Sequence, residues 1–143
     1  MIRPYYLLDT NIVSEFSKER PDVQVAAFYE IRKDMCAISA VTWQELTRGI
    51  ERLPEGRRKQ YLQNCLARYE EYLDIIPYDK FAAQIYGEMQ AMAEEDGKTL
   101  ANYDSQVAAT AISNGMVLVT HNVADFKLIK EKAFLRVEDW FSV

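Results

Sequence analysis

The chain has 143 residues, of which 49% are hydrophobic and 27% charged, a composition that excludes a disordered or fibrous protein. This length can bury a core without disulfides or metals, so we expect one domain over residues 1–143. Seventeen Lys and Arg stand against 22 Asp and Glu, giving a net charge of −5. Such a chain repels a polyanion at long range unless its basic residues cluster.

No apolar run approaches the roughly 18 residues that a membrane-spanning helix needs. The N-terminus also reaches an acid after only a few apolar residues, unlike an export signal. We therefore expect no membrane association and a cytoplasmic location. Cys36 and Cys65 lie apart in apolar surroundings, without the close pairing of a zinc or redox site, as is typical of free thiols in a reducing compartment.

The first half of the chain alternates short apolar runs with helical patterns. Residues 5–8 predict a strand that stops at Asp9, and Ile12, Val13 and Phe16 follow at helical spacing. Pro21 is expected in the first turn of the next helix. The further predicted elements are a helix over 21–33, a strand over 36–39, a helix over 41–52 and a helix over 57–72.

The second half continues the alternation. It predicts a strand over 73–77, a helix ending near Gly97, a helix over 103–113, a strand over 116–120 and an edge strand over 134–137. The inner stripe of the helix before Gly97 is expected to be Phe81, Ile85, Met89 and Met92. This order predicts an α/β fold with a mainly parallel sheet, in which ligands bind beyond the carboxyl ends of the strands.

Four acids stand at the ends of these elements. Asp9 ends the first strand, and Glu45 lies near the start of the helix after the second strand. Asp104 opens a helix, and Asp125 follows the strand that ends at Thr120. Mg²⁺ prefers oxygen ligands and keeps several waters, so two or three carboxylates can hold it beside a phosphate. Crowded carboxylates without a cation raise one another's pKa, which favours a metal site here.

Each acid also has a structural interpretation when taken alone. Asp9, or Asn11 beside it, fits the N-cap of a helix. The segment from Thr42 to Glu45 fits a reciprocal capping box. Asp104 is favoured by the helix dipole, and Asp125 has the setting of a solvated surface acid. Four acids at corresponding positions favour a shared metal site over four separate structural roles.

The four acids lie in four segments: Tyr-Leu-Leu-Asp-Thr-Asn-Ile-Val-Ser-Glu-Phe (6–16), Val-Thr-Trp-Gln-Glu-Leu-Thr-Arg-Gly-Ile (41–50), Tyr-Asp-Ser-Gln-Val-Ala-Ala-Thr-Ala (103–111) and Asn-Gly-Met-Val-Leu-Val-Thr-His-Asn-Val-Ala-Asp-Phe (114–126). In chain order, these segments resemble the motifs of the PIN domain, and within it the VapC-like and FitB-like toxins of bacterial toxin–antitoxin pairs. The resemblance implies a three-layer α/β/α sandwich and a Mg²⁺- or Mn²⁺-dependent endoribonuclease that cleaves by metal-activated water.

The resemblance also implies roles for particular residues. Asp9, Glu45 and Asp104 become the metal-binding acids, and Asn11 and Thr120 support them by hydrogen bonds. Some members of the family have an acid where this chain has Asn122. Either Asn122 or Asp125 could therefore be the fourth site residue. We assign Asp125 an auxiliary role.

The partners implied by the resemblance are structured RNA such as tRNA or ribosomal RNA and a small VapB-like antitoxin whose tail occupies a groove. A homodimer and a toxin–antitoxin hetero-oligomer are implied as well. One local feature agrees with RNA binding: positive charge concentrates at Arg48, Arg52, Arg57, Arg58 and Lys59. Taken alone, this charge is more typical of a solvated helix face with ordinary salt bridges.

Two other functions are compatible with parts of this pattern. An Asp-nucleophile phosphatase also begins with a strand-terminal acid, but such enzymes commonly have a second acid where this chain has Asn11. A non-cleaving module that binds RNA or a partner would keep the fold without needing the acids. His121 is the only histidine, which disfavours a histidine-based nuclease and indicates a supporting or surface role.

Overall fold

The centre of the computed structural model, which describes residues 4–142, is a five-stranded sheet. The strands are β1 (Tyr6–Leu8), β2 (Cys36–Ser39), β3 (Asp74–Ile76), β4 (Val117–Val119) and β5 (Val137–Glu138). Their order is β3-β2-β1-β4-β5, and every described pair is parallel. The predicted parallel α/β sheet is confirmed, and the carboxyl ends of all five strands lie along one edge.

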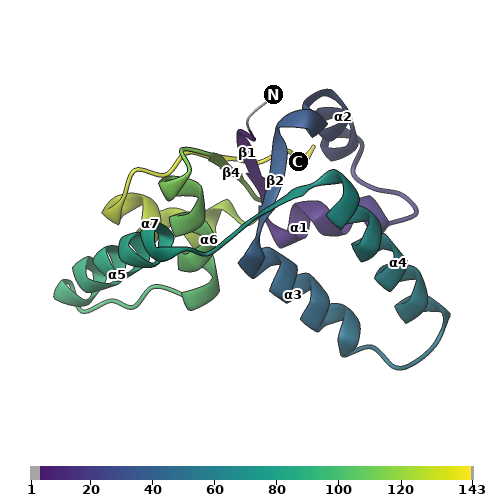
Figure 1. The fold of residues 1–143 in the computed structure, drawn as a ribbon. Helices are drawn as coiled ribbons and strands as arrows, with labels where there is room; N and C mark the ends of the chain where they lie inside the picture. Colours follow the sequence, from purple (N-terminus) through teal and green to yellow (C-terminus); the bar gives the residue numbers. More distant parts are fainter. Residues whose placement is uncertain (1–3, 143) are drawn as a thin grey trace.

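Helices cover both faces of this sheet (Figure 1). Side chains alternate along β1, so Leu7 belongs to one buried cluster and Leu8 to the other. The Leu7 face packs against α5 (Lys80–Glu95), α6 (Asn102–Ser113) and α7 (Lys127–Lys132). The Leu8 face packs against α1 (Thr10–Val13), α2 (Val23–Arg32) and α4 (Arg57–Tyr72). The three-layer α/β/α arrangement is thereby confirmed.

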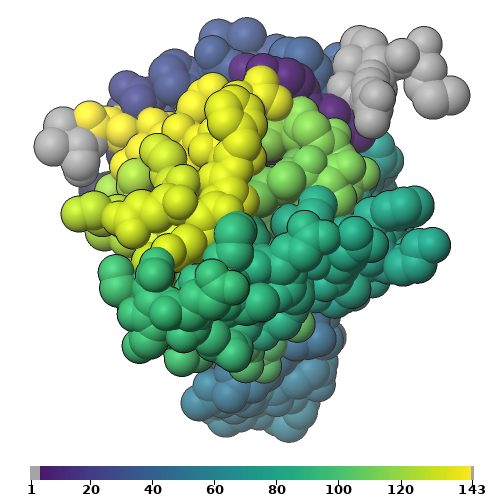
Figure 2. Space-filling model, turned by 90° about the vertical axis from the view of Figure 1, so that its left-hand side faces the viewer, coloured from purple at the N-terminus to yellow at the C-terminus, as the bar shows by residue number. Residues whose placement is uncertain are grey.

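One helix, α3 (Ala40–Glu51), contributes to both clusters and pairs with α4. Figure 1 shows α3 and α4 extending together away from the sheet. In Figure 2, α5 (teal to green) and the C-terminal segment (yellow) form most of the visible face, and the α3 region (blue) projects below them. The α3–α4 pair therefore projects beyond the rest of the molecule.

Several predicted boundaries and burials are wrong. Pro21 lies before α2 and not in its first turn, because Asp22 caps the helix by accepting from the N–H groups of Gln24 and Val25 at 3.0 Å each. Met89 is buried as predicted, whereas Phe81 and Met92 are 63% and 39% exposed. Apolar character alone did not distinguish the inner from the outer side of α5.

The C-terminal third also differs from the prediction. The last strand was predicted over 134–137 but forms at residues 137–138, and Phe134 is 83% exposed. Two short helical segments before it, η3 (Val123–Phe126) and α7, were not predicted. The end of α6 is as expected: Gly115 adopts φ +64°, and Met116 N–H bonds the carbonyl of Ala111 at 2.9 Å.

Both cysteines are buried and free, as predicted. Burial raises the pKa of the Cys36 thiol to about 12, which keeps it protonated and unreactive. Among the helices of residues 4–142, none combines the length and apolar character needed to cross a bilayer.

Candidate active site

The carboxyl ends of β1 and β4 bring together residues from distant parts of the chain. Leu8 pairs with Val119 in the parallel register, so the next residues, Asp9 and Thr120, lie side by side. Thr120 is fully buried, and its Oγ1 donates to Asp9 Oδ2 at 2.9 Å. The central strand pair of the sheet therefore fixes the first acid of the cluster.

Asp9 is both a helix cap and a buried acid. Its Oδ1 accepts from the N–H of Thr10 at 2.9 Å, which makes it the N-cap of α1. Asn11 Nδ2 donates to Thr120 Oγ1 at 3.2 Å and reaches Asp9 Oδ2 at 3.5 Å. Burial raises the pKa of Asp9, and the negative charges of nearby acids add to the increase, while the hydrogen bonds oppose it. Capping and membership of the acid cluster are not exclusive alternatives.

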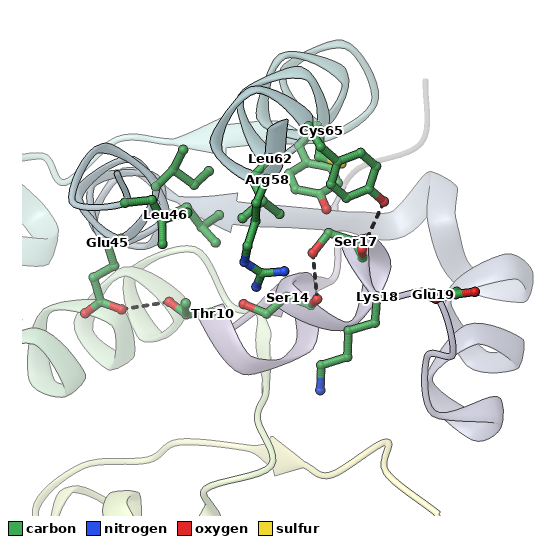
Figure 3. Close-up of a pocket in the computed structure, with 15 residues that line it drawn as sticks. Thr10, Ser14, Ser17, Lys18, Glu19, Glu45, Leu46, Arg58, Leu62 and Cys65 are labelled. Carbon is green, nitrogen blue, oxygen red and sulfur yellow. Dashed lines mark hydrogen bonds between the residues drawn. The ribbon is translucent and has the colours of Figure 1, made fainter. Parts of the chain in front are cut away.

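Glu45 does not belong to a capping box. The N-cap of α3 is Ser39, whose Oγ accepts from the N–H of Thr42 at 3.0 Å, so Thr42 is inside the helix. Glu45 lies in the second turn, where its Oε2 accepts from Thr10 Oγ1 at 2.7 Å (Figure 3). The capping-box interpretation is wrong because the helix begins three residues earlier than that interpretation requires.

Asp104 lies in the first turn of α6, as predicted, and is half-buried. Burial is the largest cause that raises its pKa to about 6, and the charges of Asp9, Asp125 and Glu45 contribute in that order. Within residues 4–142, its carboxylate receives no hydrogen bond or salt bridge from another side chain or from the backbone. The protein thus crowds Asp104 with other acids and supplies no positive partner.

The two candidates for the fourth position differ in what they offer. Asp125 lies exposed in η3, and its charge raises the pKa of both Asp9 and Asp104. Asn122 donates its backbone N–H to Thr120 Oγ1 at 3.1 Å. Of the two residues, Asp125 is the one that adds negative charge to the cluster.

The donor set fits a hydrated divalent cation. Among residues 4–142, no three His, Cys, Asp or Glu side chains stand close enough to enclose an ion by themselves. Mg²⁺ commonly takes one or two carboxylates and keeps its other positions for water and phosphate. A mutually repelling carboxylate cluster at an open edge suits that kind of binding better than it suits a closed cage of protein ligands.

A groove of about 810 Å³ begins beside Glu45 and runs between α1, α3 and α4. It extends over η1 (Ser14–Ser17), and Figure 3 shows Arg58 reaching from α4 towards Ser14. Leu46 and Leu62 supply part of its apolar lining. The groove therefore offers apolar surface and two cationic side chains, Lys18 and Arg58, and Glu45 of the acid cluster is part of its lining.

The predicted basic cluster is only partly available. Lys59 is 7% exposed, and its Nζ bonds Glu55 Oε1 at 2.9 Å and the carbonyl of Glu51 at 3.2 Å. Its position in the cluster is therefore a structural one, holding α3 to α4. Four arginines of the cluster are exposed: Arg48, Arg52, Arg57 and Arg58.

The sequence analysis missed two sets of residues at the carboxyl ends of the strands. Thr10, which holds Glu45, follows Asp9 directly and could have been found as a hydroxyl beside a strand-terminal acid. Asp139 and Phe141 contact His121, although they lie outside every motif. No sequence spacing indicates those contacts, because the β4–β5 pairing creates them.

Fold and site together describe a parallel α/β protein with an acidic cluster beyond the carboxyl ends of its strands. Residues 6–132 match the model of the PIN domain family, and the chain belongs to that family.

Two curated relatives and one solved structure illustrate the similarity. VapC ribonuclease Y4jK of Sinorhizobium fredii is 32% identical over 127 residues, covering 85% of this chain and 89% of that protein. The tRNA(fMet)-specific endonuclease VapC of Shigella flexneri is 31% identical over 137 residues, covering 94% and 97%. A chain in the crystal structure of DNA-bound VapBC from Salmonella typhimurium aligns with a TM-score of 0.81 at 26% identity, covering 96% and 98%.

Proposed function

We propose that this chain is a metal-dependent endoribonuclease and the toxin of a type II toxin–antitoxin pair. The observation that carries the proposal is the acid cluster, in which burial and neighbouring acids raise the pKa of both Asp9 and Asp104. Perturbed acids gathered at one open site are typical of catalytic centres. Membership of the PIN family and the names of the relatives, which include ribonucleases and an endonuclease, support the same activity.

The chain's own residues divide the work of such a site. Asp9 and Asp104 would hold Mg²⁺ or Mn²⁺, and Glu45 would complete the site or orient the attacking water. Thr10 engages one oxygen of Glu45, which leaves the other free for that water. Thr120 and Asn11 fix the carboxylate of Asp9, and Asp125 has an auxiliary role. The bound cation supplies charge neutralisation at the phosphate and a more acidic water.

The proposed substrate is structured RNA, with tRNA or ribosomal RNA as the first candidates. One relative is named for tRNA(fMet). The net charge of −5 opposes RNA at long range, so local cations must supply the phosphate contacts. The exposed arginines of α3 and α4 fit that role, whereas Lys59 does not, because Glu51 and Glu55 already engage it.

The proposed regulator is a small VapB-like antitoxin whose tail occupies the groove between α1, α3 and α4. The apolar lining and the position beside Glu45 suit a peptide that covers the acids while it buries its own apolar side chains. The structural relative is a VapBC assembly. We also propose a homodimer and a cytoplasmic location, for which light scattering and cell fractionation are the direct measurements.

The test is cleavage of a broad RNA panel by purified, partner-free protein with Mg²⁺ or Mn²⁺, followed by sequencing of the cleavage ends. Asp9→Asn and Asp104→Asn are the inactive variants, and Asp34→Asn, an exposed acid outside the cluster, is the matched control. We expect discrete ends that require metal and both cluster acids. Binding without cleavage would establish the non-cleaving module instead. A trapped phosphate on Asp9 would establish the phosphatase.

A further inference from the structure

An aromatic pair lies just beyond the carboxyl end of β4, where His121 directly follows Thr120. The imidazole of His121 stacks on the ring of Phe141, with centroids 4.0 Å apart and planes at 27°. His121 Nδ1 lies 3.1 Å from Asp139 Oδ2 and 3.3 Å from Oδ1. The His121 side chain nevertheless stays 42% exposed. Phe141 stacks on one ring face and Asp139 approaches the Nδ1 edge, and these two contacts leave a large part of the side chain accessible.

The pair is held rigidly from the C-terminal side. Phe141 N–H donates to Asp139 Oδ1 at 3.0 Å. Gln24 Nε2 donates to the carbonyls of Trp140 and Phe141 at 3.0 and 3.1 Å, and Trp140 itself is fully buried. A surface that is already ordered binds a ligand at a lower entropic cost than a mobile one.

The same pair is tied to the acids. His121 directly follows Thr120, which donates to Asp9. The backbone N–H of His121 donates to Asn11 Oδ1 at 2.9 Å, and Asn11 donates in turn to Thr120. These hydrogen bonds fix the backbone of His121 next to Thr120 and Asn11, while Asp139 and Phe141 hold its ring.

We propose that His121 is a stacking platform for an unpaired nucleobase of the RNA, next to the phosphate at the acid cluster. The proposal rests on the proposed ribonuclease function and names the contact that would select among RNA sites. Single-stranded bases are recognised by stacking on aromatic side chains, histidine among them. His121 supplies a partly exposed ring, an orientation held by Phe141 and Asp139, and a backbone that directly follows Thr120, the hydrogen-bond donor to Asp9.

The alternative is that His121 only staples the C-terminal segment to β4 through Asp139. That role requires the contact between His121 Nδ1 and Asp139 but no exposed ring face. The two roles predict different results when the His121 side chain is removed. If His121 only holds the C-terminal segment, cleavage of every substrate should fall equally. If it stacks on a base, the loss should depend on one nucleotide position.

The experiment measures kcat/KM on a short RNA that the wild-type protein cuts, and on a series in which single nucleotides near the cut are made abasic. We expect one position at which loss of the base lowers kcat/KM about 10-fold for the wild type. His121→Ala should lose a similar factor on intact RNA and be insensitive to the abasic change. His121→Phe should restore most of the activity, since it keeps the ring. Phe134→Ala, an exposed aromatic outside the site, is the matched control.

The outcomes separate this inference from the proposed function. If the wild type cuts every abasic RNA as well as intact RNA, the platform is refuted and the ribonuclease stands. Equal losses on all substrates in His121→Ala, with a lower Tm, would establish the staple instead. If no RNA is cut, a fluorescent adenine analogue decides the matter: quenching on binding that His121→Ala abolishes and His121→Phe retains supports the platform, and unchanged quenching overturns it.

Discussion

Asp9 and Asp22 are both aspartates that cap helices, yet their surroundings are opposite. Asp22 accepts backbone hydrogen bonds from Val25 and Gln24 and a hydroxyl hydrogen bond from Ser142, and these hold its pKa below the usual range. Asp9 also accepts hydrogen bonds, but burial and neighbouring acids raise its pKa. A cap whose donors satisfy its charge is structural. The negative charge of a cap that is crowded by other acids is not compensated within the protein, so a bound cation would stabilise it.

The most direct test of this difference between Asp9 and Asp22 is to remove the charge of each cap by substitution with Asn. Asp9→Asn should lower RNA cleavage by more than about 100-fold, above the loss that is typical when an outer partner of a metal ligand is removed. Asp22→Asn should lower the thermal stability, and its folded fraction should still cut RNA. The test is the cleavage rate of each variant divided by its folded fraction, which circular dichroism measures. Full activity in Asp9→Asn would remove Asp9 from the catalytic site.

The hydrogen bond from Thr120 offers a smaller test of how Asp9 is held. Thr120→Val keeps the shape of the side chain but removes the hydroxyl that Asp9 accepts from. We expect cleavage to fall by about 10- to 100-fold and the apparent metal affinity to fall with it. Metal titration of the cleavage rate separates the two effects. Wild-type metal dependence would show that Thr120 does not orient Asp9.

Asp104 of the acid cluster and the cap Asp22 should change the stability of the fold in opposite directions as pH rises. The folded-state pKa of Asp104 is about 6 against an ordinary value of 3.8, so metal-free folded protein binds the proton more tightly than the unfolded chain does. Its effect on stability therefore becomes less favourable as pH rises from about 4 to 6. Asp22 has a lowered pKa, so its contribution is present above its ordinary value and is lost as pH falls through the lower one.

Thermal unfolding in chelator from pH 4 to 7 measures this difference. Relative to the wild type, Asp104→Asn should gain stability towards pH 7, and Asp22→Asn should lose it. Mg²⁺ should raise the Tm of the wild type more at pH 7 than at pH 5, because protons compete with the cation at Asp104. A Mg²⁺ effect of equal size in Asp104→Asn would place the metal elsewhere.

The smallest expected effect separates the cap of α3 from Glu45. Ser39→Ala removes the side chain that caps the helix and should cost about 1 kcal/mol of unfolding free energy. Glu45→Gln should leave the stability near that of the wild type while lowering cleavage. Denaturant unfolding together with cleavage assays compares the two variants. A loss of stability in Glu45→Gln as large as that in Ser39→Ala would indicate a structural role for Glu45.

The sequence by itself determined the first four strands, the long helices and the placement of four acids near the ends of these elements, whereas the last strand was misplaced. Hydrophobic periodicity and capping residues are local signals, and the end of α6 at Gly115 was visible for that reason. The limits of local signals appear at Glu45, where a capping box fitted the residue types, although the helix begins at Ala40. They appear again on α5, where Phe81 and Met92 have core-like side chains but face outwards.

Only the tertiary structure decided how these residues meet. The parallel register of β1 and β4 places Thr120 against Asp9 across 111 positions of the chain. The β4–β5 pairing brings Asp139 and Phe141 to His121, and the α3–α4 packing engages Lys59 with Glu51 and Glu55. The sequence suggested that crowded carboxylates would raise one another's pKa, but burial, which is the largest cause at Asp9 and Asp104, arises only when distant segments pack.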